Sequence, residues 1–193
     1  MNLSNILTVV RIVLAFVFLL LILLPGFISK ILAAAVFAVA SLTDFYDGYY
    51  ARKYHLESDF GKFMDPVADK FLILTAFFIF TKMQIVSVWM FVLIFFREAL
   101  ITVFRLLVMR KGEVLAAESL GKIKTVSQIT AIFFILMLVA IKEFSYDHAV
   151  PDAVIQGFRY GINVLMVACV LLTVISGITY LWHNRRFVYG SAH

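Results

Sequence analysis

The sequence of 193 residues has little charge and almost no cysteine. Only 15% of its residues are charged and 63% are hydrophobic, whereas soluble domains average about 25% charged and about 45–50% apolar residues. A soluble globular protein is therefore excluded. The single cysteine, Cys169, lies in an apolar run, which excludes an internal disulfide framework and a cysteine-ligated zinc or iron–sulfur site. The chain also lacks a basic run interleaved with aromatic residues, and we expect no nucleic-acid partner.

Long apolar runs occupy most of the chain, separated by polar stretches or by pairs such as Pro25-Gly26. A membrane-spanning helix needs roughly 20 apolar residues, so the pattern predicts an all-α integral membrane protein with six transmembrane helices. We expect one membrane domain over residues 1–189, followed by a tail at 190–193 to which we assign no function. The predicted helices are residues 6–24, 30–52, 64–82, 86–108, 122–142 and 156–182.

Positive charge is distributed unevenly around the six predicted helices. If the crossings alternate, twelve Lys and Arg residues lie on one side of the membrane and four on the other, with Arg97 inside the fourth helix. Cytoplasmic loops carry the excess of Lys and Arg in membrane proteins. The sequence therefore predicts that both termini lie in the cytoplasm, and we expect a bacterial cytoplasmic membrane and contact with its anionic lipids.

Four aspartates end one apolar run and begin the next. Asp44 and Asp47 are three residues apart, and Asp65 and Asp69 are four apart, so each pair lies on one face of its helix. A helical hairpin would bring the four carboxylates together at the cytoplasmic edge of the bilayer. Carboxylates without His or Cys favour Mg²⁺ or Mn²⁺, and repulsion among four carboxylates indicates two such ions.

The acidic pairs belong to a longer pattern, Asp44-x-x-Asp47-Gly48-x-x-Ala51-Arg52, then eight residues, then Gly61-x-x-x-Asp65-x-x-x-Asp69. Gly48 leaves the helix surface open to a ligand or another backbone. Arg52, one turn further on, can hold a phosphate or a nucleobase edge. All eight fixed positions resemble the signature of the CDP-alcohol phosphotransferases. This family displaces CMP from a CDP-linked lipid or alcohol, using divalent metals, and joins a second alcohol to the remaining phosphate.

The resemblance implies roles for the residues of the pattern. Asp44, Asp47 and Asp65 would bind metal, and Asp69 would both bind metal and be the catalytic general base for the acceptor hydroxyl. Gly61 would also ease the turn between the two helices. The resemblance further implies a homodimer. The residues expected to bind the CDP-lipid are Asn5, Thr8, Gly48, Ala51, Arg52 and Gly61.

Three further stretches resemble the branch of that family whose acceptor is sn-glycerol 3-phosphate. They are the opening Asn2–Arg11, the segment from Arg97-Glu98 to Arg105, and Gly121–Thr125. We interpret Arg97 and Glu98 as a structural pair that neutralises itself between helices. An acceptor with its own phosphate needs cations besides the metals, and free amides at a helix N-terminus also favour phosphate. The expected acceptor-phosphate residues are Arg105, Arg110, Lys122, Lys124 and Thr125.

We therefore expect an enzyme that transfers a phosphatidyl group from CDP-diacylglycerol to glycerol 3-phosphate, giving phosphatidylglycerophosphate and CMP. Two alternatives stay open. One is a sibling enzyme whose acceptor is inositol phosphate, serine or phosphatidylglycerol. The other is a divalent-cation transporter, because membrane carboxylates also mark ion pathways. The clustering of all four acids near one membrane face argues against a transporter.

Overall fold

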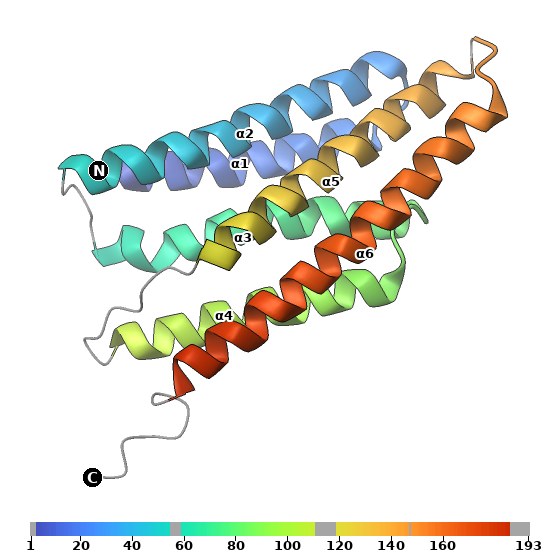
Figure 1. The fold of residues 1–193 in the computed structure, drawn as a ribbon. Coiled ribbons are helices and arrows are strands. Elements are labelled where there is room, and N and C mark those ends of the chain that lie inside the picture. The colour runs from blue at the N-terminus through green and yellow to red at the C-terminus, as the bar shows by residue number, and fades with distance from the viewer. Residues whose placement is uncertain (1–2, 55–58, 111–118, 147, 186–193) are drawn as a thin grey trace.

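The residues that the computed structural model describes form six α-helices and no strand (Figure 1). The structure describes the backbone of residues 3–54, 59–110, 119–146 and 148–185, and the side chains of residues 9–43, 70–108, 121–146 and 148–185. The expected all-α fold with six helices is confirmed. The helices are α1 Leu3–Leu23, α2 Phe27–Tyr54, α3 Asp59–Lys82, α4 Val88–Arg110, α5 Ser119–Phe144 and α6 Asp152–His183.

The largest difference from the predicted bounds is at the start of α3. This helix begins at Asp59 rather than at residue 64, and aspartate is a residue type that is favourable in the first turn of a helix. Gly61 consequently lies in the first turn of α3. The expectation that Gly61 eases the turn between the two helices is therefore wrong.

The six helices run alternately up and down (Figure 1). The starts of α1, α3 and α5 and the ends of α2, α4 and α6 lie at one end of the bundle, which we call the site end. Neighbours in sequence pack together as α1 with α2, α3 with α4 and α5 with α6, and α5 also packs against α2 and α3. This arrangement brings all the residues proposed from the sequence for catalysis and binding to the site end.

Most of the buried side chains of the bundle are apolar and belong to one core. The ring centroid of Phe37 on α2 lies 5.6 Å from that of Phe18 on α1 and 5.5 Å from that of Phe133 on α5. Aromatic rings favour such tilted and edge-on contacts. Cys169 on α6 is fully buried in the same core. The packing joins α1, α2, α5 and α6 around one interior.

The outside of the bundle is also apolar. On α6, for example, the side chains of Val164, Leu171, Ile175 and Ile178 are each more than half exposed. Contiguous exposed apolar surface of this kind is rare on soluble monomers and marks contact with a membrane or a partner. In the described part of the chain, two segments are long and apolar enough to cross a membrane, and two shorter segments are apolar. These segments are Gly121–Phe144 and Asp152–His183, and the shorter Val9–Leu23 and Phe27–Thr43. The fold is consistent with a membrane protein.

At the end of the bundle opposite the site end, hydrogen bonds connect the turn between α1 and α2 to α2 and to α5. Gly26 turns the chain between α1 and α2 with φ of 102°, a conformation that side chains other than glycine's rarely allow. The buried ammonium of Lys30 donates to the carbonyl oxygens of Ile22, at 2.8 Å, and of Leu24. Ile22 lies in the last turn of α1 and Leu24 directly follows this helix, where carbonyl groups lack partners within the helix. The backbone N–H of Gly26 donates to Glu143 on α5, so this turn also holds α5.

Candidate active site

The four aspartates lie near the end of α2 and near the start of α3. Asp44 and Asp47 belong to the last turns of α2, and Asp65 and Asp69 to the first turns of α3. Figure 1 shows the end of α2 and the start of α3 at the site end, and the two helices pack against each other. The predicted hairpin is therefore present, whereas the four carboxylate groups themselves lie outside the described side chains.

The chemistry of this donor set fits a hard divalent cation. Four carboxylates supply only oxygen ligands, which is the set that Mg²⁺ and Mn²⁺ prefer. Among the side chains that the structure describes, no three His, Cys, Asp or Glu residues come together as a metal site. The aspartates of α2 and α3 are the metal ligands that the sequence proposes.

The buried carboxylate of Glu98 on α4 contacts four other side chains. We call this group the Glu98 cluster, and its members are Glu98, Lys70, Arg97, Lys124 and Gln128. Glu98 on α4 is 1% exposed. Its Oε1 accepts hydrogen bonds from Nζ of Lys124 and, at 3.2 Å, from Nε2 of Gln128, both on α5. Its Oε2 lies 3.6 Å from Nζ of Lys70 on α3 and 3.5 Å from a terminal nitrogen of Arg97. One carboxylate thus links three helices.

The predicted pairing of Arg97 with Glu98 is present but is only one contact of this cluster. Neighbouring residues on a helix point in different directions, so Arg97 also reaches α6, where it donates a 3.0 Å hydrogen bond to the hydroxyl of Ser176. Sequence reasoning missed Lys70 and Gln128. The spacing of Lys124 and Gln128, four residues apart in an apolar run, is the signal that could have indicated a shared buried partner.

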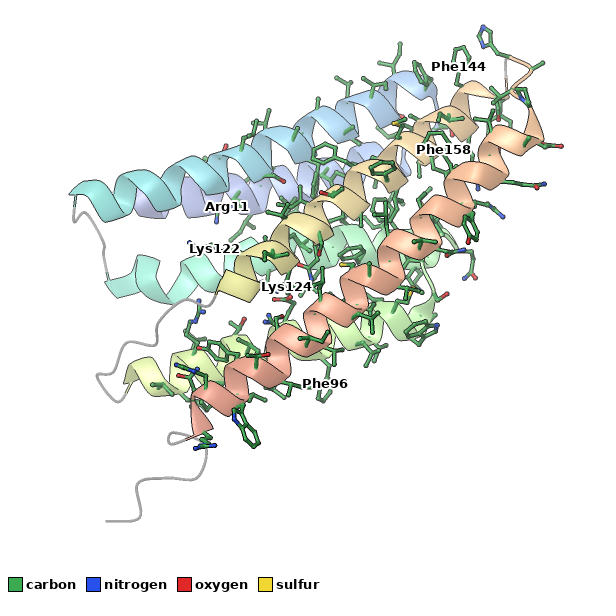
Figure 2. All side chains as sticks on the ribbon, viewed as in Figure 1. Arg11, Phe96, Lys122, Lys124, Phe144 and Phe158 are labelled. Carbon is green, nitrogen blue, oxygen red and sulfur yellow. The ribbon has the colours of Figure 1, made fainter. Side chains whose placement is uncertain are left out.

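The candidate acceptor residues on α5 differ in exposure. Lys122 is exposed, whereas Lys124 is 1% exposed and is held by Glu98. Figure 2 shows both lysines near the start of α5, with Arg11 on α1 at the same end of the bundle. Because α5 begins at Ser119, Thr125 lies in its second turn, and its hydroxyl donates a 3.1 Å hydrogen bond to the carbonyl of Gly121.

The candidate acceptor residues on α4 lie in its last turns. The guanidinium of Arg105 is 5.8 Å from the ring centroid of Tyr180 on α6, a cation–π contact. Within the described part of the chain, the buried Nε of Arg105 and the hydroxyl of Tyr180 have no hydrogen-bond partner. Tyr180 was not among the sequence candidates. The side chain of Arg110 lies outside the described residues.

The backbone places the candidate CDP-lipid residues on three helices at the site end. Asn5 and Thr8 lie at the start of α1, and the remaining four lie on α2 and α3. Their side chains are outside the described set. Arg11, one turn beyond Thr8, is buried. The first half of α1 therefore places a cationic side chain in the interior of the bundle. The four on α2 and α3 are Gly48, Ala51, Arg52 and Gly61.

A glycine on α6 makes room for Arg97. A Cβ atom at Gly177 would lie 3.0 Å from Cγ of Arg97, closer than such atoms approach without displacement. Gly157, on the same helix, has nothing within 4 Å of an added Cβ atom. The absence of a side chain at position 177 therefore lets the arginine cross the face of α6 and reach Ser176.

We expect Gly177→Val to destabilise the protein by about 1–3 kcal/mol, because the added methyl groups must displace a closely packed side chain. Thermal unfolding of the purified protein in detergent measures the change. Gly157→Val is the matched control, since it adds the same residue to the same helix where there is open space. Equal destabilisation by the two substitutions would contradict the role assigned to Gly177.

Antiparallel helices with an apolar exterior are consistent with a membrane protein, and the acidic segments of α2 and α3 lie at the same end of the bundle as the buried Arg11 and Lys124 (Figures 1 and 2). The chain belongs to the CDP-alcohol phosphatidyltransferase family, which it matches over residues 1–175. It is therefore an enzyme of phosphatidyl transfer, and the resemblance found in the sequence is confirmed.

Similar proteins occur in several bacteria. One is the CDP-diacylglycerol--glycerol-3-phosphate 3-phosphatidyltransferase of Bacillus subtilis, 37% identical over 195 aligned residues that cover 95% of each chain. A probable phosphatidylglycerophosphate synthase of Mycobacterium tuberculosis is 38% identical over 193 residues, covering 98% of this chain and 84% of the relative. The Rickettsia typhi protein that shares the name of the Bacillus subtilis enzyme is 36% identical over 136 residues, covering 70% of this chain and 76% of its own.

Proposed function

We propose that this protein transfers the phosphatidyl group of CDP-diacylglycerol to sn-glycerol 3-phosphate, giving phosphatidylglycerophosphate and CMP. The observation that carries the proposal is the 37% identity, over 95% of both chains, to a relative named for this reaction. The position of the acidic pattern supports it, because α2 and α3 bring their acidic segments to the bundle end at which the candidate cations of α4 and α5 also lie.

The proposal includes a placement in the membrane. All six helices would cross the bilayer of a bacterial cell, with both termini and the site end at the cytoplasmic surface. The alternating helices and the excess of Lys and Arg at the site end support this orientation. In this placement the acyl chains of the lipid stay in the bilayer while its diphosphate and cytidine reach water. We also propose a homodimer, which the family resemblance supports.

The acidic residues carry the proposed chemistry. Asp44, Asp47, Asp65 and Asp69 would hold two Mg²⁺ or Mn²⁺ ions, which when bound neutralise negative charge on the diphosphate and on departing CMP. Asp69 accepts the proton of the acceptor hydroxyl as the hydroxyl oxygen attacks the lipid-side phosphorus. The new P–O bond forms as the bond to CMP breaks.

The remaining candidates would bind the two substrates. Asn5, Thr8, Gly48, Ala51, Arg52 and Gly61 would contact the nucleotide and diphosphate. Positive charge around the acceptor would bind its phosphate, since Arg and Lys form strong charge-assisted hydrogen bonds with phosphate oxygens. The residues proposed for this are Arg105, Arg110, Lys122, Lys124 and Thr125.

Release of CMP from CDP-diacylglycerol by the purified protein tests the proposal. We expect release to require both a divalent metal and glycerol 3-phosphate, because the acceptor is a substrate of the same step. Inositol phosphate, serine and phosphatidylglycerol are the control acceptors. Metal-dependent release with one of these instead would show a sibling enzyme. No release with any acceptor, together with metal uptake into sealed proteoliposomes, would favour a transporter.

A further inference from the structure

The Glu98 cluster joins the helix that carries Asp65 and Asp69 to the helix that carries Lys124. We propose that Glu98 is a positioning residue: it holds the ammonium of Lys124 at the acceptor's phosphate and fixes α3 beside it. The inference rests on the proposed function, in which Lys124 binds that phosphate. It assigns to Glu98 a role in acceptor binding without contact between Glu98 and the substrate.

The surroundings of Glu98 indicate a fixed carboxylate. Both of its oxygens face donors, from Lys124 and Gln128 on one side and from Lys70 and Arg97 on the other. A buried ion is costly unless nearby charges and hydrogen bonds compensate it, and any displacement of this carboxylate would break such contacts on three helices. The group is thus held in place from α3, α4 and α5 at once.

The contact between Glu98 and Lys70 connects α4 to α3, the helix that carries the proposed metal ligands Asp65 and Asp69. Lys70 directly follows Asp69 in the sequence, and its Nζ lies 3.6 Å from Oε2 of Glu98. Within the next turn of α3, the side chains of Leu72 and Ile73 are buried. Together these contacts set the rotation of α3 about its axis at the residue next to the proposed general base.

The contact with Lys124 bears on the acceptor. An ammonium group has three N–H donors, so Lys124 can donate to Glu98 and still donate to a phosphate. Its side chain is 2% exposed, and a buried ammonium without a counter-ion would shift toward water. Removal of the Glu98 charge should therefore displace Lys124 from the place at which it would meet the acceptor.

A double-mutant cycle tests the inference. We expect Glu98→Gln and Lys124→Met each to raise the KM for glycerol 3-phosphate by about tenfold or more. The KM for CDP-diacylglycerol should stay within about twofold of wild type. The double variant should be no worse than Lys124→Met alone, because coupled residues are non-additive. Glu98→Asp keeps the charge and should restore part of the affinity.

The matched control is Glu143→Gln, which removes a carboxylate from α5 at the opposite end and leaves an oxygen to accept the hydrogen bond from Gly26. It should leave both KM values unchanged. Size-exclusion chromatography reports whether each variant is folded. If Glu98→Gln lowers kcat or the melting temperature but leaves both KM values unchanged, the inference is overturned. It is also overturned if the increases in the KM for glycerol 3-phosphate of the two single variants multiply in the double variant. Failure of the proposed function is distinguishable from failure of this inference. It would appear in the wild-type protein, as CMP release that does not depend on glycerol 3-phosphate.

Discussion

Replacing Asp69 by asparagine is expected to slow CMP release by about a thousandfold, which is within the range that general base catalysis contributes. Asparagine has nearly the same shape as aspartate but cannot take the proton of the acceptor hydroxyl, and it is a weaker ligand for a divalent cation. The rate is measured with purified protein at saturating CDP-diacylglycerol and glycerol 3-phosphate.

Asp152→Asn is the matched control for this substitution. Asp152 is an exposed aspartate at the start of α6, at the opposite end of the bundle, and its replacement should leave the rate unchanged. The melting temperatures of both variants should remain near that of the wild-type protein. A rate near the wild-type value for Asp69→Asn would remove Asp69 from the mechanism and leave the base unassigned.

Chelation of divalent metal is expected to reduce CMP release to below about 1% of its starting rate, because the metals supply several kcal/mol of charge stabilisation in such sites. EDTA removes the metal, and Mg²⁺ or Mn²⁺ added in excess should restore the rate. The control is EDTA already saturated with Mg²⁺, which has the same chelator concentration and should have no effect.

The dependence of the rate on metal concentration locates the site. Asp44→Asn removes one proposed ligand and should shift the half-maximal Mg²⁺ concentration upward, whereas Asp152→Asn should not shift it. Full activity after exhaustive chelation would contradict the metal site altogether. An unchanged metal dependence in Asp44→Asn would contradict the assignment of that aspartate alone.

The number of helices follows from the sequence because each helix is a continuous apolar run. The bounds are less accurate where a helix continues into polar residues, as α3 does at Asp59. Hydropathy ends a helix at the first polar residue, whereas the backbone can continue its hydrogen bonds outside the apolar layer.

The acidic helix ends were predicted from spacing alone, whereas the partners of Glu98 were not. Residues three or four apart on one helix share a face whatever the fold is, so the aspartate pairs can be identified from the sequence. The contact between Glu98 and Lys124 depends instead on how α4 and α5 are rotated toward each other, which the spacing within either helix does not determine. The neighbouring Arg97 is the obvious partner in sequence, yet this arginine also donates a hydrogen bond to Ser176 on α6.

The buried position of Cys169 makes the orientation of the protein accessible to chemical labelling. A buried structural thiol is inert toward polar reagents, and this is the only cysteine in the sequence. A single cysteine introduced into a connecting segment would therefore be the one thiol that a membrane-impermeant maleimide can reach in the folded protein. Whether intact cells or only opened cells are labelled then reports which side of the bilayer that segment faces, without first removing the native cysteine.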